Sequence, residues 1–222
     1  MLRNIVHWII KAVVLATCKI NVEGIDKIPK NGGCIIASNH LGRMDVILGY
    51  YIIKRKDIIL TIAEKYYKIL LFRITARALD AIFIDRYKVD YRALRQVLKR
   101  LNNGGIMVIA PEGTRSKTES LIEGKPGAAY LAIKTNVPII PVALTGTEDR
   151  VVIERLSKWK RPQLTVTIGD PILAHQDPKL NRSEAIKQLT EEIMCQIALM
   201  LPSKYHGVYG EHPRLMELLT AK

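Results

Sequence analysis

The sequence predicts an α/β fold: a mixed, largely parallel sheet covered by helices on both faces, with an N-terminal amphipathic membrane-interface helix. Short apolar runs typical of buried strands alternate with segments whose apolar residues recur at helical spacing. Polar side chains follow several of these runs directly, as they do where strands end in ligand-binding loops. The N-terminal stretch is apolar in a helical pattern but carries charge. We therefore expect a helix over residues 1–20 and one folded domain over residues 21–222.

The composition narrows the kinds of partner. At 222 residues the chain is long enough for one well-packed domain, and a hydrophobic content of 48% argues against disorder. The net charge of +13 indicates an anionic partner, such as an acidic membrane surface, a phosphorylated substrate or nucleic acid. Only 6% of the residues are aromatic, and neither a basic helix nor a zinc-finger spacing is visible. Nucleic acid is therefore the least favoured of the three.

The segment 2–20 has the period of a helix and is mostly apolar, but Lys11 interrupts its centre. A membrane span needs about 20 predominantly apolar residues, so this segment is too short. Asn4, His7 and Lys11 share one narrow stripe of the helix. The wider apolar face holds Ile5, Trp8, Ile9, Ala12, Val13 and Ala16. This pattern suits a helix lying in a membrane interface, and it also suits a helix packed on the protein's own core.

The first predicted strand, 34–37, follows the turn-rich stretch 22–33 and ends abruptly in polar residues. The next segment, 45–54, has the character of a buried helix and ends in basic residues. A second strand is expected over 58–63. A mixed basic segment, 64–79, separates it from a third, short strand.

That third strand covers 81–84, and a helix capped by Asp90 follows it, with apolar residues at every third or fourth position. The Asn-Gly-Gly sequence at 103–105 ends this helix. The fourth strand, 106–110, comes next and leads into another polar turn.

In the second half of the chain, a helix is expected over 128–135, and the fifth and sixth strands over 139–144 and 164–168. A capping box at 181–184 predicts the start of the last long helix. The tail after Pro202 has no clear period and predicts no element.

His40 and Asp45 are the first candidates for catalysis. On one continuous helix they would lie about 140° apart, so they can meet only if the loop folds back and Asp45 begins the next helix. In that arrangement the carboxylate holds one ring nitrogen, and the other nitrogen acts as a general base. A plain alternative stays open, in which Asp45 is an ordinary helix cap and His40 a loop residue.

Further polar residues follow the other strands. His40, Arg86 and the segment 112–115 each come directly after a predicted strand, so we expect them at one edge of the sheet around one pocket. The three cysteines are far apart in apolar settings, which indicates buried thiols in a reducing compartment. The five histidines show no metal-ligand spacing, so no metal site is expected.

Four blocks of sequence resemble one known family. Residues 39–45, NHLGRMD, look like the NHxxxxD signature of glycerolipid acyltransferases, the lysophosphatidic acid acyltransferase family. Residues 81–86, AIFIDR, resemble the block that ends in the family's acceptor-binding arginine. PEGTRS at 111–116 and VPIIPV at 137–142 match two further blocks, in the family's order.

The resemblance implies an acyltransferase domain that moves a fatty acyl group from acyl-CoA or acyl carrier protein to lysophosphatidate, giving phosphatidate in phospholipid biosynthesis. It implies no cofactor, no metal and no nucleic acid. The enzyme would be monotopic, on an anionic lipid surface at the cytoplasmic face of a membrane. Another lysophospholipid or a glycolipid is the alternative acceptor, and a non-catalytic basic membrane- or nucleic-acid-binding protein is a more distant alternative.

The resemblance also implies a role for each matched residue. His40 and Asp45 would be catalytic, and Asn39 and Lys125 would support them. The residues that bind the acceptor and its phosphate would be Arg86, Glu112, Gly113, Thr114 and Arg115. Both arginines can grip a phosphate with paired donors, and Glu112 would orient Arg115 or hydrogen-bond the acceptor hydroxyl. Backbone N–H groups near Gly42 or Gly113 are candidate donors to the oxyanion.

Two positions depart from the family pattern. Asp80 stands where the family usually has a glycine, and its carboxylate can offset the charge of Arg86. The stretch 124–127, GKPG, stands where the family usually has Phe-Lys-x-Gly. Farther along, residues 158–161 form a basic cluster around Trp159, which suits either membrane headgroups or a solvated loop.

Overall fold

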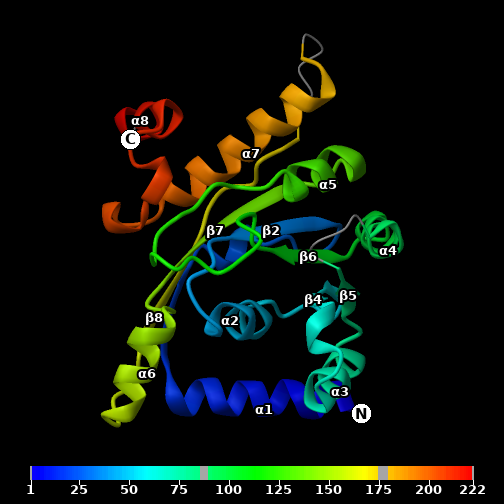
Figure 1. Ribbon diagram of the computed structural model, residues 1–222, viewed down its shortest axis with the longest axis vertical. Coiled ribbons are helices and arrows are strands. Elements are labelled where there is room, and N and C mark those ends of the chain that lie inside the picture. The colour runs from blue at the N-terminus through cyan, green and yellow to red at the C-terminus, as the bar shows by residue number, and fades with distance from the viewer. Residues whose placement is uncertain (1, 86–89, 175–179, 222) are drawn as a thin grey trace.

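A six-stranded sheet forms the centre of the computed structural model, which describes residues 2–85, 90–174 and 180–221 (Figure 1). Its strands, in spatial order, are β1 (Lys19–Glu23), β8 (Gln163–Ile168), β7 (Ile139–Thr145), β2 (Cys34–Ser38), β6 (Ile106–Ile109) and β3 (Ile58–Ile59). Neighbouring strands are parallel except β7 and β8. The mixed, largely parallel sheet expected from the sequence is confirmed.

Helices cover both faces of the sheet. Figure 1 shows α1 (Leu2–Thr17) and α2 (Met44–Ile52) on one side, and α5 (Gly127–Thr135) and α7 (Arg182–Leu199) on the other. Successive side chains of a strand point to opposite faces. Ile35 accordingly packs in the core beneath α5 and α7, whereas Ile36 packs in the core beneath α2. Burial on both faces explains why the strands are continuous apolar runs.

Several elements differ from the sequence prediction. The helix expected over 2–20 ends at Thr17, and β1 follows it and pairs in parallel with β8. The strand expected over 58–63 divides into β3 and β4 (Thr61–Ala63), and β4 pairs with β5 (Ile82–Ile84) in a separate two-stranded sheet. The mixed basic segment contains α3 (Leu70–Ala78).

The C-terminal half adds elements that the sequence did not predict. A helix, α6 (Asp149–Ser157), lies between β7 and β8. The tail after Pro202 contains two short 3₁₀ turns and α8 (Pro213–Thr220). The predicted capping box at the start of α7 is present, because Asn181 and Glu184 bond each other's backbone N–H groups. The side chain of Asp90 likewise caps α4 (Tyr91–Asn102).

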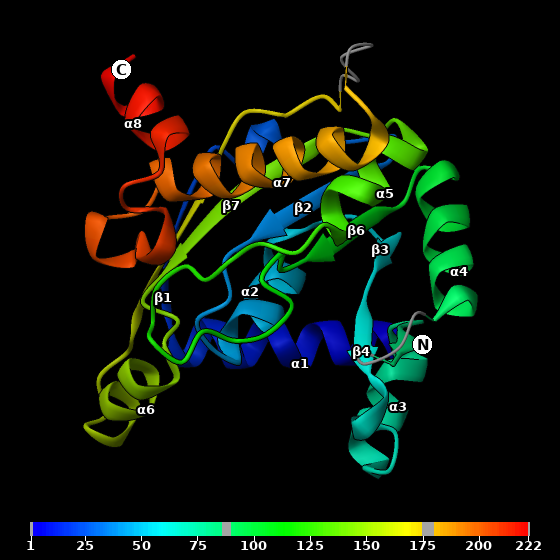
Figure 2. The ribbon, with the colours of Figure 1, turned by 45° about the horizontal axis from the view of Figure 1, so that its top comes forward.

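The arrangement of β2, β6 and β7 positions the site. These three strands are adjacent and parallel, so their carboxyl ends lie at the same edge of the sheet (Figure 2). The loop after β2 carries His40, the loop after β6 carries residues 112–115, and the loop after β7 carries Thr147, Glu148 and Asp149. Segments far apart in the sequence are therefore neighbours at this edge.

Candidate active site

The loop after β2 folds around the Asp45 carboxylate. Oδ2 of Asp45 accepts hydrogen bonds from Nδ1 of His40 at 2.7 Å, Leu41 N–H at 2.7 Å and Gly42 N–H at 2.9 Å. Asp45 lies in the first turn of α2, so the loop returns on itself as the sequence predicted. Because an ionised carboxylate only accepts, His40 carries its proton on Nδ1 and leaves Nε2 as the basic nitrogen.

Asn39 fixes the start of this loop. Its side-chain amide donates to the Leu144 carbonyl at 2.9 Å and accepts from Leu144 N–H at 2.7 Å. The pair of bonds continues the β2–β7 ladder by one residue through a side chain that is almost fully buried. Asn39 therefore supports His40 by holding the preceding backbone against β7.

Glu112 supports the same loop from the β6 side. Its carboxylate accepts from His40 N–H at 2.8 Å and from Ile122 N–H at 3.2 Å. Burial raises the pKa of this carboxyl to about 7, although the two backbone N–H groups act in the opposite direction. The side chain is 1% exposed and makes no bond to Arg115, so the prediction that Glu112 orients that guanidinium is wrong. The other predicted role of Glu112, a hydrogen bond to the acceptor hydroxyl, stays a prediction.

Arg115 is instead held by a residue that the sequence analysis missed. Its Nη1 donates to Oδ2 of Asp149 at 2.7 Å, and Oδ1 of Asp149 accepts from Arg43 N–H at 2.8 Å. Asp149 therefore joins the loops after β2 and β6. Arg86, the other predicted phosphate ligand, lies outside the described residues.

A cavity of about 490 Å³ opens beside His40. Its polar lining includes His40, Lys125 and the carboxylates of Asp45, Asp85 and Asp90, and the Lys125 side chain lies against Gly113. Elsewhere the lining is largely apolar and comes mainly from β5, β6, α4 and α5: Leu60, Ile84, Ala93, Leu94, Val97, Met107, Ile109, Ala128 and Leu131. Thr114 is exposed next to this wall and does not line it. The site thus combines a basic nitrogen, a lysine and a largely apolar cavity.

The backbone donors proposed for the oxyanion are already engaged. Gly42 N–H donates to Asp45, and Gly113 N–H donates to the Ala110 carbonyl at 3.0 Å. These two N–H groups are therefore not free for a substrate oxyanion, and the expectation that other backbone N–H groups of the two loops serve as donors stays a prediction. Among the residues that the structure describes, Lys125 is the lysine or arginine that lines the same cavity as His40.

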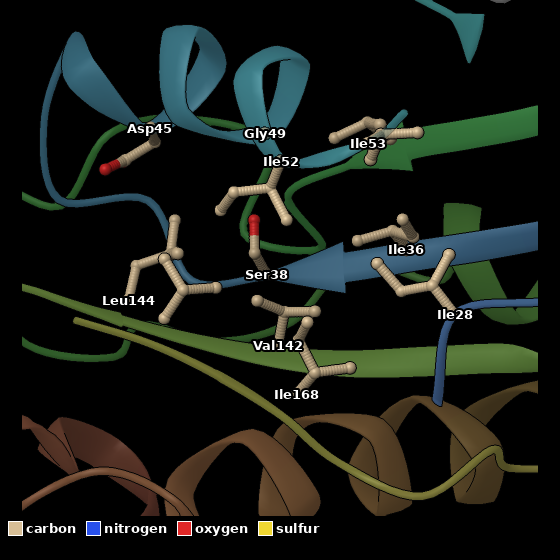
Figure 3. A pocket seen from close by; sticks show the side chains of 12 residues that line it. Ile28, Ile36, Ser38, Asp45, Gly49, Ile52, Ile53, Val142, Leu144 and Ile168 are labelled. Carbon is tan, nitrogen blue, oxygen red and sulfur yellow. The ribbon is translucent and has the colours of Figure 1, made fainter. Parts of the chain in front are cut away.

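A second cavity, of about 30 Å³, lies between α2 and the sheet (Figure 3). Ser38 and Asp45 contribute to its wall, and the other labelled residues are Gly49 and residues with apolar side chains. This volume has room for no more than a few water molecules. Only the larger cavity is therefore suited to an organic substrate.

The two departures from the family pattern have local explanations. Asp80 has φ of 52°, a left-handed conformation that glycine adopts freely and aspartate tolerates, and its carboxylate pairs with Arg100 at 3.0 Å. Its charge is therefore paired with an arginine of α4. At Gly124, an added Cβ would lie 2.6 Å from Cγ of Met194, so α7 occupies the space that a larger side chain would need.

The cysteines take no part in this site. All three are buried and free. Burial raises the pKa of the Cys34 and Cys195 thiols to about 11, which keeps them protonated and poorly nucleophilic. His40 is thus the reactive side chain that the geometry favours.

Comparison with known proteins places these loops in context. A model of the acyltransferase family matches residues 19–145. The 1-acyl-sn-glycerol-3-phosphate acyltransferase of Borreliella burgdorferi is 28% identical over 181 residues, which cover 72% of this chain and 72% of that enzyme. The enzyme of the same name from Haemophilus influenzae is 28% identical over 142 residues, covering 62% of this chain and 57% of its own length.

A solved structure has a similar fold. The 1-acyl-sn-glycerophosphate acyltransferase from Thermotoga maritima has a TM-score of 0.61 and 25% sequence identity, covering 86% of this chain and 78% of that one. The stretch 19–145 runs from the start of β1 to the end of β7. It contains the site loops after β2 and β6, whereas Asp149 lies beyond it.

Proposed function

This chain belongs to the acyltransferase family, and on that premise we propose that it transfers a fatty acyl group from acyl-CoA or acyl carrier protein to the free hydroxyl of lysophosphatidate, giving phosphatidate. The observation that carries the proposal is the His40–Asp45 pair in the wall of a largely apolar cavity of about 490 Å³. The names of the relatives favour this acceptor. Another lysophospholipid or a glycolipid is the alternative acceptor.

The proposed transfer is direct. Nε2 of His40 takes the proton of the acceptor hydroxyl while that oxygen attacks the carbonyl carbon of the thioester. The carbon–sulfur bond breaks, and the proton passes from His40 to the leaving thiolate, which restores the base. Asp45 stabilises the imidazolium formed between the two steps. The step needs no metal or cofactor, since the thioester is itself a substrate.

The cavity supports an assignment for each part of the donor. Its apolar lining suits a fatty acyl chain, whose burial is favourable by about 0.8 kcal/mol per methylene group. The Lys125 ammonium at the polar wall is suited to stabilising the thioester oxygen as it gains negative charge. We assign the acceptor phosphate to Arg115, together with Arg86.

The acceptor assignment can be tested with purified protein and a panel of lyso-acceptors and acyl-thioesters, with lipid products identified by mass spectrometry. A phosphate monoester carries close to two negative charges at neutral pH, so lysophosphatidate should be used more efficiently than acceptors whose phosphate is capped by a headgroup. A difference of about tenfold or more in kcat/KM is expected, the value of one charge-assisted hydrogen bond. Equal use of capped and uncapped acceptors would contradict the assignment of lysophosphatidate and favour another lysophospholipid or a glycolipid as the acceptor.

We also propose that α1 (Leu2–Thr17) is a membrane-interface helix and that the enzyme is monotopic, on the cytoplasmic face of an anionic membrane. No helix in the described part of the chain is long and apolar enough to span a bilayer. The side chains on the predicted apolar face of α1 are exposed: Ile5, Trp8, Ile9, Ala12, Val13 and Ala16. The opposite side of α1 contributes Val14, which is fully buried. The helix thus has an apolar surface left over after packing on the domain.

Neighbouring elements extend this surface. α3 contacts α1 (Figures 1 and 2). It exposes Leu70, Phe72 and Ile74, and basic residues lie on the same helix. At the other end of α1, Arg161 donates to the Leu15 carbonyl, and the adjacent Trp159 is 98% exposed. Exposed apolar groups with flanking cations are the chemistry that anionic lipid surfaces attract.

Replacing Trp8 and Ile9 together with Ser should weaken binding to phosphatidylglycerol-containing vesicles by at least about tenfold, because two side chains would lose their burial in lipid. High salt should weaken wild-type binding without abolishing it, since only the charged part is screened. Vesicle sedimentation measures both effects. Val208→Ser removes an equally exposed apolar side chain from the C-terminal tail and should change little. Undiminished sedimentation of the double variant would contradict the proposal.

A further inference from the structure

We propose that Asp149 is a positioning residue that aligns the catalytic loop with the phosphate-binding arginine, an inference that rests on the proposed acyl transfer. One oxygen of its carboxylate accepts from Arg43 N–H at 2.8 Å, in the loop between His40 and Asp45. The other accepts from Nη1 of Arg115 at 2.7 Å. A single side chain therefore sets the spacing between the proposed base and the proposed phosphate ligand.

The backbone around Asp149 is fixed on both sides. A Cβ on Gly42 would overlap the Thr147 carbonyl oxygen and lie 3.1 Å from Asp149 N, so the two loops are in direct contact. Glu148, which precedes Asp149, is buried, and Oε1 of its carboxylate accepts from the Tyr205 hydroxyl at 2.5 Å. The C-terminal tail thus holds the loop that presents Asp149.

The geometry leaves Arg115 able to bind a ligand. Among the described residues, Nη1 is the only nitrogen of this guanidinium bonded to a protein acceptor. Asp149 therefore bonds one nitrogen of the Arg115 guanidinium and leaves Nε and Nη2 to donate to phosphate oxygens. The Arg115 side chain is 39% exposed and that of Asp149 31%, so the ion pair is accessible to a bound acceptor. The carboxylate orients the guanidinium without burying it.

Two substitutions separate the two bonds. Asp149→Asn keeps a carbonyl oxygen for Arg43 N–H but removes the charge that holds Arg115. Both substitutions also remove the longer ion pair of Asp149 Oδ2 with Nη1 of Arg43 at 3.7 Å, whose arginine side chain is 71% exposed and contributes little. Asp149→Asn should raise KM for lysophosphatidate about three- to tenfold, a range reduced by solvent screening, and leave kcat and the KM for the thioester nearly unchanged. Asp149→Ala removes both hydrogen bonds and should in addition lower kcat, because the loop that carries His40 loses an anchor. Asp170→Asn, which removes an exposed carboxylate paired with Lys27, is the matched control.

A double-mutant cycle with Arg115→Ala decides between positioning and general stability. If Asp149 acts on the acceptor through Arg115, Asp149→Asn should add little to the KM of the Arg115→Ala enzyme. Independent, multiplying effects on KM, or an unchanged acceptor KM in Asp149→Asn, would overturn the proposal. Should Asp149→Ala not fold, the Asp149→Asn cycle still decides. A wild-type enzyme that does not acylate lysophosphatidate would instead count against the proposed function, so the two failures are distinguishable.

Discussion

Replacing His40 with Ala should lower kcat for acyl transfer by about 10²- to 10⁴-fold, the range expected when a general base is lost. The fold should survive the change, because Asp45 keeps its bonds to Leu41 and Gly42 N–H when the imidazole is removed. The acceptor KM should change much less than kcat, since His40 acts on the hydroxyl proton and not on the phosphate. Steady-state kinetics and circular dichroism measure the two properties.

Asp45→Asn should also lower kcat, but by less than His40→Ala does. Its amide oxygen can still accept the backbone N–H groups, but it stabilises the imidazolium less than a carboxylate does. His212→Asn is a suitable control, because His212 caps α8 and Asn is an effective cap. A folded His40→Ala enzyme with near-normal turnover would rule out the mechanism.

The His40–Asp45 contact could be predicted because it is local. The two residues are five positions apart, and a carboxylate is favourable in the first turn of a helix. The bonds that position this pair are not local. Asn39 bonds Leu144, 105 residues away, and Arg43 bonds Asp149, 106 residues away. Both contacts depend on β7 lying next to β2, an order that the apolar pattern of the strands does not specify.

Two of the elements that the sequence did not predict, β1 and α6, lack a clear apolar period. In β1, exposed side chains alternate with half-buried Ile20 and Val22, a short pattern that continues directly from α1. In α6, Val152 is the one buried residue, so the helix has no apolar stripe to reveal it. Asp149 was missed for the same reason, because the helix that it begins was not recognised.

Glu112 is a residue that the sequence identified correctly but whose partners it did not predict. The motif identified the residue, but its neighbour Arg115 suggested the wrong partner, because Glu112 bonds the N–H groups of His40 and Ile122 whereas Arg115 bonds Asp149. A carboxylate in a polar turn is exposed in most proteins. Only the packing of the loop against β2 explains why this one is buried and why burial raises its pKa to about 7.

The free energy of unfolding should therefore fall as the pH rises from about 4.5 to about 7, because in this range the Glu112 carboxyl ionises more readily in the unfolded chain than in the folded one. Below about pH 4.5 the carboxyl is protonated in both the folded and the unfolded chain, and above about pH 7 it is ionised in both. Between these values the folded chain binds more protons, so the unfolding free energy decreases with pH. A raised pKa of this size corresponds to a loss of about 3 kcal/mol across the interval, to within a factor of about two.

Glu112→Gln isolates this contribution, because glutamine does not titrate. The difference in unfolding free energy between wild type and Glu112→Gln, measured by denaturant titration in mild detergent, should fall between pH 4 and pH 8 by about 3 kcal/mol. The slope is the diagnostic quantity, since glutamine also loses one acceptor for the N–H groups of His40 and Ile122 at every pH. Carbon-13 NMR of labelled glutamates, with the Glu112→Gln variant identifying the resonance, should give a titration midpoint for Glu112 near pH 7. Parallel stability curves and a midpoint near 4.5 would mean that the carboxyl is solvated, and that the His40 backbone is held by something other than a buried carboxylate.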